Sequence, residues 1–388
     1  MRRLGTAGPT DNPRSAARVQ PGLPEERRVP VVPVVSIVIP CYNHGRFLTE
    51  ALASIGQPAV PTEIVVVDDG STDDTPVVVA TFETPHAFRS VRQQNAGLAG
   101  ARNRGLRESR GQYVVFLDAD DQLAPGAIDI GVTALEEHPE CAFVFGRSRL
   151  MDRDGTLLHT SGQPRIVRDH YRELLRRNYI WMPGMVMFRR DALERVGGFN
   201  ADVNAAADYE IYLHIARHHP VYDHGQVVAH YRKHDANMSR NASRMLRETL
   251  AVIASQRRFL EGDEASLAAY EEGWRNWQDF YGTHLVTEIR SAVRRWRWHE
   301  ALGKAVVLGY YHPRALWHHI RHKTALTLSR SHGRRAIPAA AAPAGPGRPP
   351  AADAGNRDRS SGLPQAPDRG AHEVHSRVVD DSSDLARR

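Results

Sequence analysis

The chain contains little cysteine and no long apolar run. Cys41 and Cys141 are the only cysteines among 388 residues, which excludes a disulfide framework and is compatible with a reducing compartment. The longest apolar stretches, 31–39 and 305–311, are far shorter than the roughly 18 residues that a membrane span needs. The N-terminal arginines are not followed by the apolar core of a secretory signal. These absences predict a cytoplasmic protein.

Glycine-rich phosphate loops are also missing. No Gly-x-Gly-x-x-Gly turn follows the first predicted strand, and the sequence contains no P-loop. Nicotinamide-dependent and ATP-hydrolysing classes therefore lack the loop that would hold their phosphates.

Positive charge is uneven: the formal net charge is +6, and arginine is dense in 1–28 and 289–335. Such basic segments suit contact with a membrane surface or a polyanion; alternatively, their charges are simply solvated. We expect no nucleic-acid partner.

Composition predicts four regions. Residues 1–33 and 331–388 are rich in Arg, Pro, Ala or Gly without periodicity, which predicts a disordered N-terminal arm and a disordered tail. Residues 34–240 alternate between strand-like and helix-like segments and predict an α/β domain. Residues 241–330 have a helical pattern and predict an α-helical C-terminal region.

The first half of the chain predicts a three-layer αβα sandwich. Apolar runs indicate strands at 34–39, 63–67, 88–93 and 113–117. Helical segments between them imply right-handed crossovers, hence a Rossmann-like sandwich with a mostly parallel central sheet. Ser71 or Thr72 is expected to cap the helix after the second strand. A hairpin at 142–160, a strand at 185–189 and a helix at 209–218 are expected further on.

Acidic residues follow the predicted strands. The clusters are Asp68-Asp69, Asp118 to Asp121, and Asp208. The carboxyl ends of parallel strands line the crevice in which open α/β sheets bind ligands. Unpaired carboxylates so close together repel one another, so a cation is expected to join them. A divalent metal that carries a diphosphate meets this need, which predicts a nucleotide-sugar enzyme.

Five segments together resemble the family 2 inverting glycosyltransferases of the GT-A fold. They are VSIVIPCYNHGRFLTEALASI, EIVVVDDGSTDDT, QQNAGLAGARNRGL, YVVFLDADDQLAPGAI and GGFN with DYEIYLHIA, in order over about 36–216. The resemblance implies that 34–240 is a catalytic domain. It also implies transfer of a sugar from a nucleoside diphosphate sugar, most often UDP-linked, to a glycan or lipid-linked acceptor hydroxyl with inversion. Cell-surface polysaccharide or glycoconjugate synthesis is the implied setting.

The nucleotide base needs a flat wall and a hydrogen-bond acceptor. Pro40 and Tyr42 after the first strand and Asp69 after the second are placed to supply them. The residues that the resemblance assigns to nucleotide-sugar binding are Pro40, Tyr42, Asn43, Asp69, Asn95, Gly97, Arg102 and Asp118. Alternatively, Tyr42 and Asn43 form only a turn, and Asp68 only orients its neighbour.

Asp118 and Asp120 form a DxD pair that predicts a metal site. Mg²⁺ binds carboxylates, phosphate oxygens and water, and Mg²⁺ or Mn²⁺ would neutralise the leaving diphosphate. Asp120 is expected to be the direct ligand, and Asp121 to be a spectator that caps a helix. A late family segment of the form Tyr-Arg-x-His implies that His234 is a second ligand and Arg232 a phosphate partner; otherwise His234 is a surface residue.

Asp208 is the expected general base. Inverting transfer needs one carboxylate to take the proton of the acceptor hydroxyl as that oxygen attacks. The family usually has Glu before this Asp, whereas this chain has Ala207, so an orienting neighbour is missing. The alternative is that Asp208 merely begins the helix at 209–218.

Two tryptophan-bearing segments leave alternatives open. Trp181 either stacks on an acceptor sugar or belongs to the core. The stretch 290–304 combines several Arg with Trp296, Trp298 and Leu302. It either lies in a lipid interface, which would place the protein at the inner face of the membrane, or packs its Trp residues on the catalytic domain.

Two other functions remain possible at this point. One is a non-catalytic sugar-nucleotide or glycan-binding protein on the same fold, which the Ala207 departure favours. The other is a phosphatase of the haloacid dehalogenase type, because 151–158 matches its Asp-x-Asp-Gly-Thr loop. For that segment, a hairpin turn is the expected structure.

Overall fold

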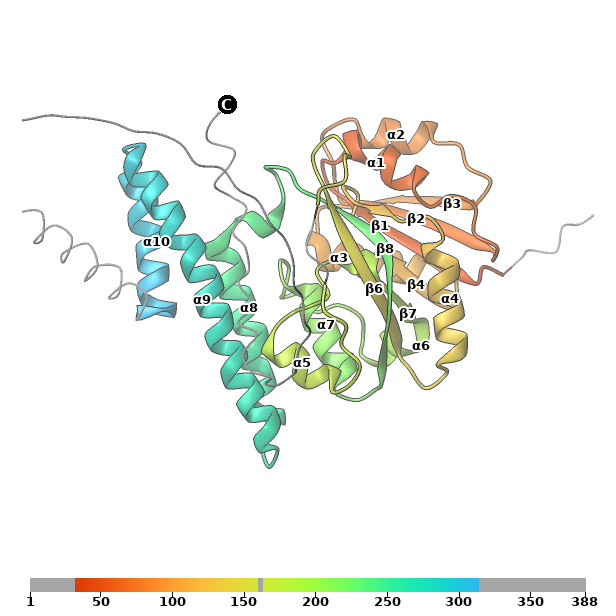
Figure 1. Cartoon of the computed structure of the whole chain (residues 1–388). Coiled ribbons are helices and arrows are strands. Elements are labelled where there is room, and N and C mark those ends of the chain that lie inside the picture. Colours follow the sequence, from red (N-terminus) through yellow and green to blue (C-terminus); the bar gives the residue numbers. More distant parts are fainter. Residues whose placement is uncertain (1–31, 160–162, 314–388) are drawn as a thin grey trace, which may run out of the picture. The chain divides into compact units, whose positions relative to one another are not determined.

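The computed structural model describes residues 32–159 and 163–313 (Figure 1). The chain divides into two units, Met1–Arg330 and Ser331–Arg388, and every described residue belongs to the first. The disordered tail expected at 331–388 and nearly all of the arm expected at 1–33 lie outside the described residues, as does the helical region beyond 313.

An eight-stranded mixed sheet forms the centre of this unit, with the order β3-β2-β1-β4-β7-β6-β8-β5. The strands are β1 Val35–Cys41, β2 Thr62–Asp68, β3 Ala87–Arg92, β4 Tyr113–Phe116, β5 Gln122–Leu123, β6 Phe143–Met151, β7 Val186–Arg189 and β8 Val221–Arg232. Strands β3, β2, β1 and β4 are parallel neighbours, and β7 runs antiparallel to β4 and β6. The four strands expected from apolar runs and the mostly parallel sheet are confirmed.

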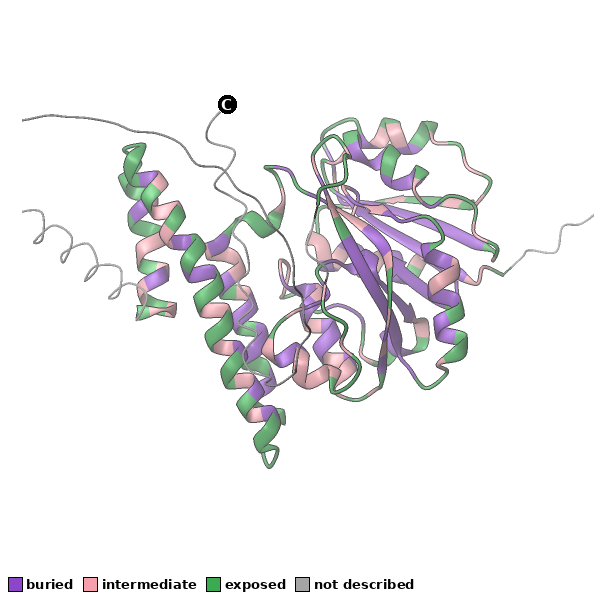
Figure 2. Cartoon of the chain, viewed as in Figure 1, coloured by how far each residue is buried: buried purple, intermediate pink, exposed green. Residues whose placement is uncertain are grey.

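Helices cover both faces of the sheet (Figure 1). The helices of the α/β part are α1 Gly45–Ala53, α2 Thr75–Thr81, α3 Gly97–Glu108, α4 Ala127–Glu137, α5 His170–Arg176, α6 Arg190–Arg195 and α7 Ala207–Ala216. One apolar core joins α1, α2 and α4 to the sheet, and a second joins α3, α5, α6 and α7 to its opposite face. Every residue of β1, β2 and β4 is therefore buried (Figure 2). The predicted three-layer sandwich of the GT-A type is confirmed.

The cap expected at Ser71 or Thr72 is wrong. Helix α2 begins at Thr75, and the Asp73 carboxylate fixes its start by accepting hydrogen bonds from the Thr75 amide and hydroxyl and from the Gly45 amide. Ser71 instead accepts a hydrogen bond from the Asn43 amide in the loop after β1. The loops after β1 and β2 are therefore tied together.

Three further helices follow within the described residues: α8 Ala242–Gln256, α9 Glu264–Arg294 and α10 Trp298–Tyr311. They share a core around Leu246, Leu285 and Leu308, and α8 also adds Val252 to the core under α5 and α7. Helix α9 approaches α5 closely at Gly273, where a Cβ atom would lie 1.8 Å from the Leu175 carbonyl oxygen. Within the described residues, no helix is long and apolar enough to cross a membrane.

The stretch 290–304 is not one continuous helix. Helix α9 ends at Arg294, and α10 begins at Trp298. Trp296 and Trp298 are 79% and 56% exposed, so the expectation that they pack on the catalytic domain is wrong. Another tryptophan of this helical region, Trp277, contacts the α/β part, because its indole donates to the Tyr209 hydroxyl.

A buried ion pair joins β6 to β8 where their register shifts. Both terminal nitrogens of Arg147 donate to the Asp223 carboxylate, at 2.9 and 2.7 Å. Arg147→Ala would leave Asp223, which is 2% exposed, without its charge partner, and should lower the free energy of unfolding by about 3–5 kcal/mol in urea titrations. Arg195→Ala, which breaks an exposed pair with Asp191, should change it by less than about 1 kcal/mol. Equal effects would contradict this assignment.

Candidate active site

Several of the residues predicted to bind the nucleotide-sugar donor lie in the loops after β1 and β2 and at the start of α3. Asp69 is 3% exposed, and its Oδ1 accepts hydrogen bonds of 2.8 Å from the Gln93 side chain and the Ala96 amide. Asp68 accepts from the Ser71 amide and so orients its own loop. Asn95 Oδ1 accepts from the Gly97 amide at the beginning of α3.

The loop after β1 offers one free aromatic face. Tyr42 is 47% exposed, whereas Pro40 is buried inside β1, paired with Val67, so the expectation that Pro40 follows the strand and forms a wall is wrong. Asn43 has a positive φ of 57°, and its Oδ1 accepts from the Thr72 amide at 2.7 Å. Asn43 therefore shapes the turn that presents Tyr42.

Arg102 is buried and lies close to two carboxylates, those of Asp118 and Asp208. Its side chain is 2% exposed and donates to Asp118 Oδ1 at 2.8 Å. Burial lowers the pKa of Arg102, but the nearby Asp118 and Asp208 outweigh it and raise the pKa. Because α3 carries Arg102 and the loop after β4 carries Asp118, this ion pair fixes the start of the DxD segment.

Asp208 lies in the first turn of α7, close to this pair, and is partly exposed. Desolvation raises its pKa to about 6, Arg102 opposes that rise, and Asp118 adds to it. Its Oδ1 accepts a 2.8 Å hydrogen bond from the Tyr209 amide. The Asp208 carboxylate is therefore more basic than an ordinary aspartate, yet it is ionised at neutral pH and partly exposed.

The second carboxylate of the DxD pair belongs to a different cluster. Asp120 Oδ2 lies 2.9 Å from His234 Nε2, and ligand atoms of His44, Asp120 and His234 all lie within 4.8 Å of one another. Burial raises the pKa of Asp120, but the His234 hydrogen bond and the charges of His44 and His234 bring the pKa below its usual value. One carboxylate and two imidazoles form a donor set that suits a divalent transition metal.

Sequence reasoning missed His44. It lies at the N-terminus of α1, in the loop that also presents Tyr42. The signal was a histidine just after the carboxyl end of a buried strand, the same position that made Asp69 and Asp118 noticeable.

Asp121 and Arg232 have structural roles, contrary to expectation. Asp121 precedes β5 and not a helix; it is 1% exposed and accepts a hydrogen bond from the Arg232 amide. Burial, Asp120 and Asp118 raise its pKa well above the usual value. The buried Arg232 guanidinium donates to the carbonyls of Asp120 and Arg153 and to the Glu50 carboxylate. Three of its five N–H groups are used in these bonds and its side chain is 0% exposed, so Arg232 is not accessible to a phosphate.

The segment before Asp208 is held by the helical region. The Glu248 carboxylate of α8 accepts hydrogen bonds from the amides of Asn204, at 3.0 Å, and Ala205. Burial raises the pKa of Glu248, but Arg244 and these amides lower it below its usual value. Ala207, where the family usually has Glu, is fully buried. A carboxylate distant in sequence therefore fastens this segment.

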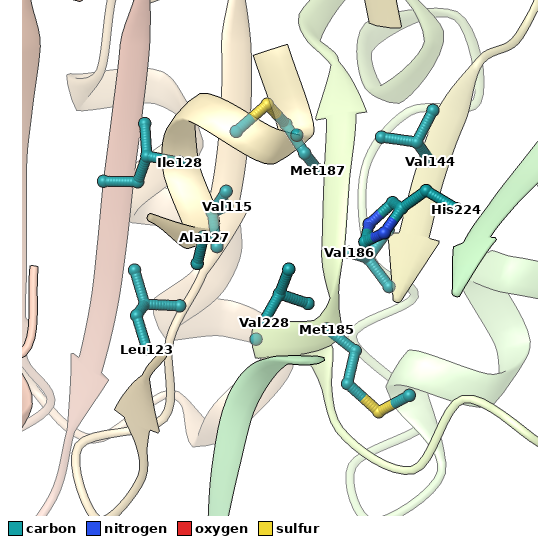
Figure 3. Close-up of a pocket in the computed structure, with 12 residues that line it drawn as sticks. Val115, Leu123, Ala127, Ile128, Val144, Met185, Val186, Met187, His224 and Val228 are labelled. Carbon is teal, nitrogen blue, oxygen red and sulfur yellow. The ribbon is translucent and has the colours of Figure 1, made fainter. Parts of the chain in front are cut away.

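Two other features lie apart from the acidic crevice. A pocket between α4 and the sheet is lined by apolar side chains such as Leu123, Ile128 and Met187, together with His224 (Figure 3). Burial lowers the pKa of His224 to about 4, so the pocket carries no charge at neutral pH. Asp152 accepts hydrogen bonds from the amides of Asp154 and Thr156 and closes the expected turn, which gives the phosphatase alternative no support.

An αβα sandwich with carboxylates and histidines at the carboxyl ends of its strands is the arrangement that the resemblance to the GT-A class predicts. The sequence model "Glycosyl transferase family 2" matches residues 36–197. The relative named "Uncharacterized glycosyltransferase YwdF" of Bacillus subtilis (strain 168) is 30% identical over 191 residues, which cover 48% of this chain and 69% of that protein. The chain belongs to glycosyl transferase family 2.

Other relatives are much longer. A chondroitin synthase of Escherichia coli is 33% identical over 187 residues, 48% of this chain and 27% of that protein. A hyaluronan synthase of Pasteurella multocida is 28% identical over 195 residues, 50% of this chain and 20% of that protein. The chain thus matches about a quarter or less of these synthases. The structure of mannosyltransferase PcManGT from Pyrobaculum calidifontis with GDP-Man and Mn²⁺ is 23% identical, covering 71% of this chain and 87% of that one, with a TM-score of 0.47.

Removing the Glu248 carboxylate should loosen the segment before Asp208. Hydrogen bonds to a charged acceptor contribute about 1.5–3 kcal/mol each, so Glu248→Ala should speed hydrogen exchange of the Asn204 and Ala205 amides at least about tenfold. Mass spectrometry of peptides that span 200–207 would measure the change. Arg244→Ala keeps both amide bonds and serves as the matched control. Unchanged exchange in Glu248→Ala would refute the role.

Proposed function

We propose that this chain transfers one sugar from a nucleoside diphosphate sugar, with UDP as the first candidate nucleotide, to an acceptor hydroxyl with inversion. The observation that supports this most directly is the segment Asp118–Asp120. Its first carboxylate is paired with Arg102 beside Asp208, and its second belongs to the His44–His234 cluster. A candidate base and a candidate metal site are therefore joined by one short loop, as a single displacement requires.

The proposed donor site lies between the loops after β1 and β2. The exposed face of Tyr42 would stack on the base, and Asp69 would accept a hydrogen bond from it. The close approach of Gly97, with a φ of 76°, to Asn204 would bound the sugar side. Arg102 acts on the donor through Asp118, because its guanidinium is buried beneath that carboxylate.

The proposed metal ligands are Asp120, His234 and His44. Mg²⁺ strongly prefers oxygen ligands, whereas imidazole suits transition metals, so Mn²⁺ fits this set better than Mg²⁺. When bound, the ion would neutralise the charge that develops on the departing diphosphate. The packing of the Phe47 ring on His234, 4.8 Å between centroids, holds that imidazole in place.

Asp208 is the proposed general base. Its partial exposure gives an acceptor hydroxyl access, and its raised pKa makes it a stronger proton acceptor than an ordinary aspartate. Arg102 keeps the carboxylate ionised at neutral pH. The Glu248 contacts to Asn204 and Ala205 support its position, which supplies the orientation that Ala207 cannot.

We further propose a glycan acceptor in cell-surface polysaccharide or glycoconjugate synthesis, since relatives are named as chondroitin and hyaluronan synthases. Trp181, which is 44% exposed, is the candidate for stacking on an acceptor sugar. A lipid-linked acceptor and a cytoplasmic location at the membrane face belong to the same proposal.

Asp208→Asn should reduce transfer by about 10²–10⁴-fold while donor affinity stays close to wild type. In the wild type, kcat/KM should rise with pH around a midpoint near 6, because Asp208 must lose its proton to act. The variant should be no less stable at pH 8, since the raised pKa means that ionised Asp208 costs stability above that midpoint. Asp202→Asn, an exposed change in the same segment, is the control. Undiminished turnover in Asp208→Asn would remove this carboxylate from the mechanism, whereas a wild type without any transfer would support a non-catalytic sugar-nucleotide binder.

Mn²⁺ with UDP should raise the melting temperature by about 5–10 °C at ligand concentrations near a hundred times Kd. The rise should be smaller with Mg²⁺ and largely lost in His234→Ala and His44→Ala, which remove imidazole ligands. His284→Ala, an exposed histidine on α9, should behave like the wild type. GDP and dTDP tested alongside UDP would identify the nucleotide. A metal response that survives in both imidazole variants would exclude the proposed ligand set.

A further inference from the structure

Helix α10 carries a row of exposed apolar side chains. Trp298, Leu302, Val306 and Tyr310 are 56%, 68%, 64% and 78% exposed. Residues four apart lie on one face of an α-helix, so these four form a continuous stripe. The opposite face of α10 is occupied, because Leu308 is buried in the core that α10 shares with α8 and α9. The stripe is thus the exposed face of a helix whose other face packs on α8 and α9.

The turn between α9 and α10 extends this face. Trp296 is 79% exposed, and its ring centroid lies 6.1 Å from that of Trp298. It has a positive φ of 60°, a conformation that is uncommon for a bulky residue. Burial of the indole does not explain that conformation. The backbone of the turn holds the ring in solvent.

Charge at the same turn is positive. Arg294 and Arg295 are exposed beside Trp296. The acidic residue of α10, Glu300, contacts Arg297 and Lys304, and Lys304 also contacts Glu288. The apolar stripe therefore ends at a cationic turn whose neighbouring carboxylates already have cationic partners.

We propose that this α10 surface, comprising Trp296, Trp298, Leu302, Val306 and Tyr310 with Arg294 and Arg295, docks on an anionic lipid bilayer. Helix α10 would lie in the plane of the interface, with its stripe among the acyl chains and the arginines at the headgroups. Tryptophan and tyrosine favour this depth because their rings are amphipathic. This surface specifies how the chain would reach the membrane face proposed above, and its test does not depend on sugar transfer.

A lipid surface fits these residues better than a second copy of the chain. A twofold interface would set the same α10 surface against itself, and this surface has no unpaired acidic group to complement Arg294 and Arg295. Anionic headgroups supply that complement at the cationic turn.

Flotation of the full chain with vesicles tests the proposal. Vesicles of phosphatidylcholine alone would be compared with vesicles that also contain phosphatidylglycerol. One variant combines Trp296→Ser, Trp298→Ser and Leu302→Ser, and another combines Arg294→Gln and Arg295→Gln. The matched control is Phe259→Ser, which changes an aromatic residue that is 43% exposed beside Arg217 and Arg258 at the other end of α9.

The wild type and Phe259→Ser should float with the anionic vesicles and not with the neutral ones. Each surface arginine contributes about fivefold, so the Arg294/Arg295 variant should bind about 25-fold more weakly, and the apolar variant at least about tenfold more weakly. Equal flotation of the apolar variant and the wild type would overturn the proposal, as would concentration-dependent dimerisation without vesicle binding. If the apolar variant loses its cooperative melting transition, the arginine variant decides the outcome, because its solvated side chains do not contribute to the core.

Discussion

Containment of the acidic segment Asp118–Asp121 is the constraint on which the rest of the structure depends. Three carboxylates within four residues repel one another, and contacts from two different elements of the chain counter this repulsion. Helix α3 supplies Arg102 to Asp118, while β8 supplies the Arg232 amide to Asp121 and its guanidinium to the Asp120 carbonyl. Burial and the two neighbouring carboxylates raise the pKa of Asp121 well above its usual value. Distant elements therefore neutralise part of the charge of this loop and hold it in place.

The same logic joins the helical region to the sandwich. Helix α8 contributes Val252 to the core beneath α5 and α7, and its Glu248 fastens the backbone ahead of Asp208. Trp277 of α9 donates to the hydroxyl of Tyr209, the residue after Asp208. Helices that carry little of the family pattern therefore hold the backbone at the start of α7, and the two regions pack as one unit.

Local pattern was sufficient for much of this architecture. The apolar runs of β1, β2 and β4 identified buried parallel strands, and acidic residues at their ends identified most residues of the candidate site. Strand β8 escaped notice because polar residues around Gly225 interrupt it, and its pairing with β6 contains register shifts. The burial of Arg232 and the meeting of His44 with His234 depend on contacts between segments almost two hundred residues apart. No local sequence signal encodes such contacts.

Gly273 has a consequence for how far this organisation extends among relatives. The Leu175 carbonyl fills the space that any larger residue there would need, so the axes of α9 and α5 can approach this closely only with glycine at that place. A homologous chain that carries alanine or valine at the aligned position must tilt or translate its long helix. The residue at that position would thus distinguish relatives that keep this close packing of α9 on α5 from relatives in which the long helix is placed differently.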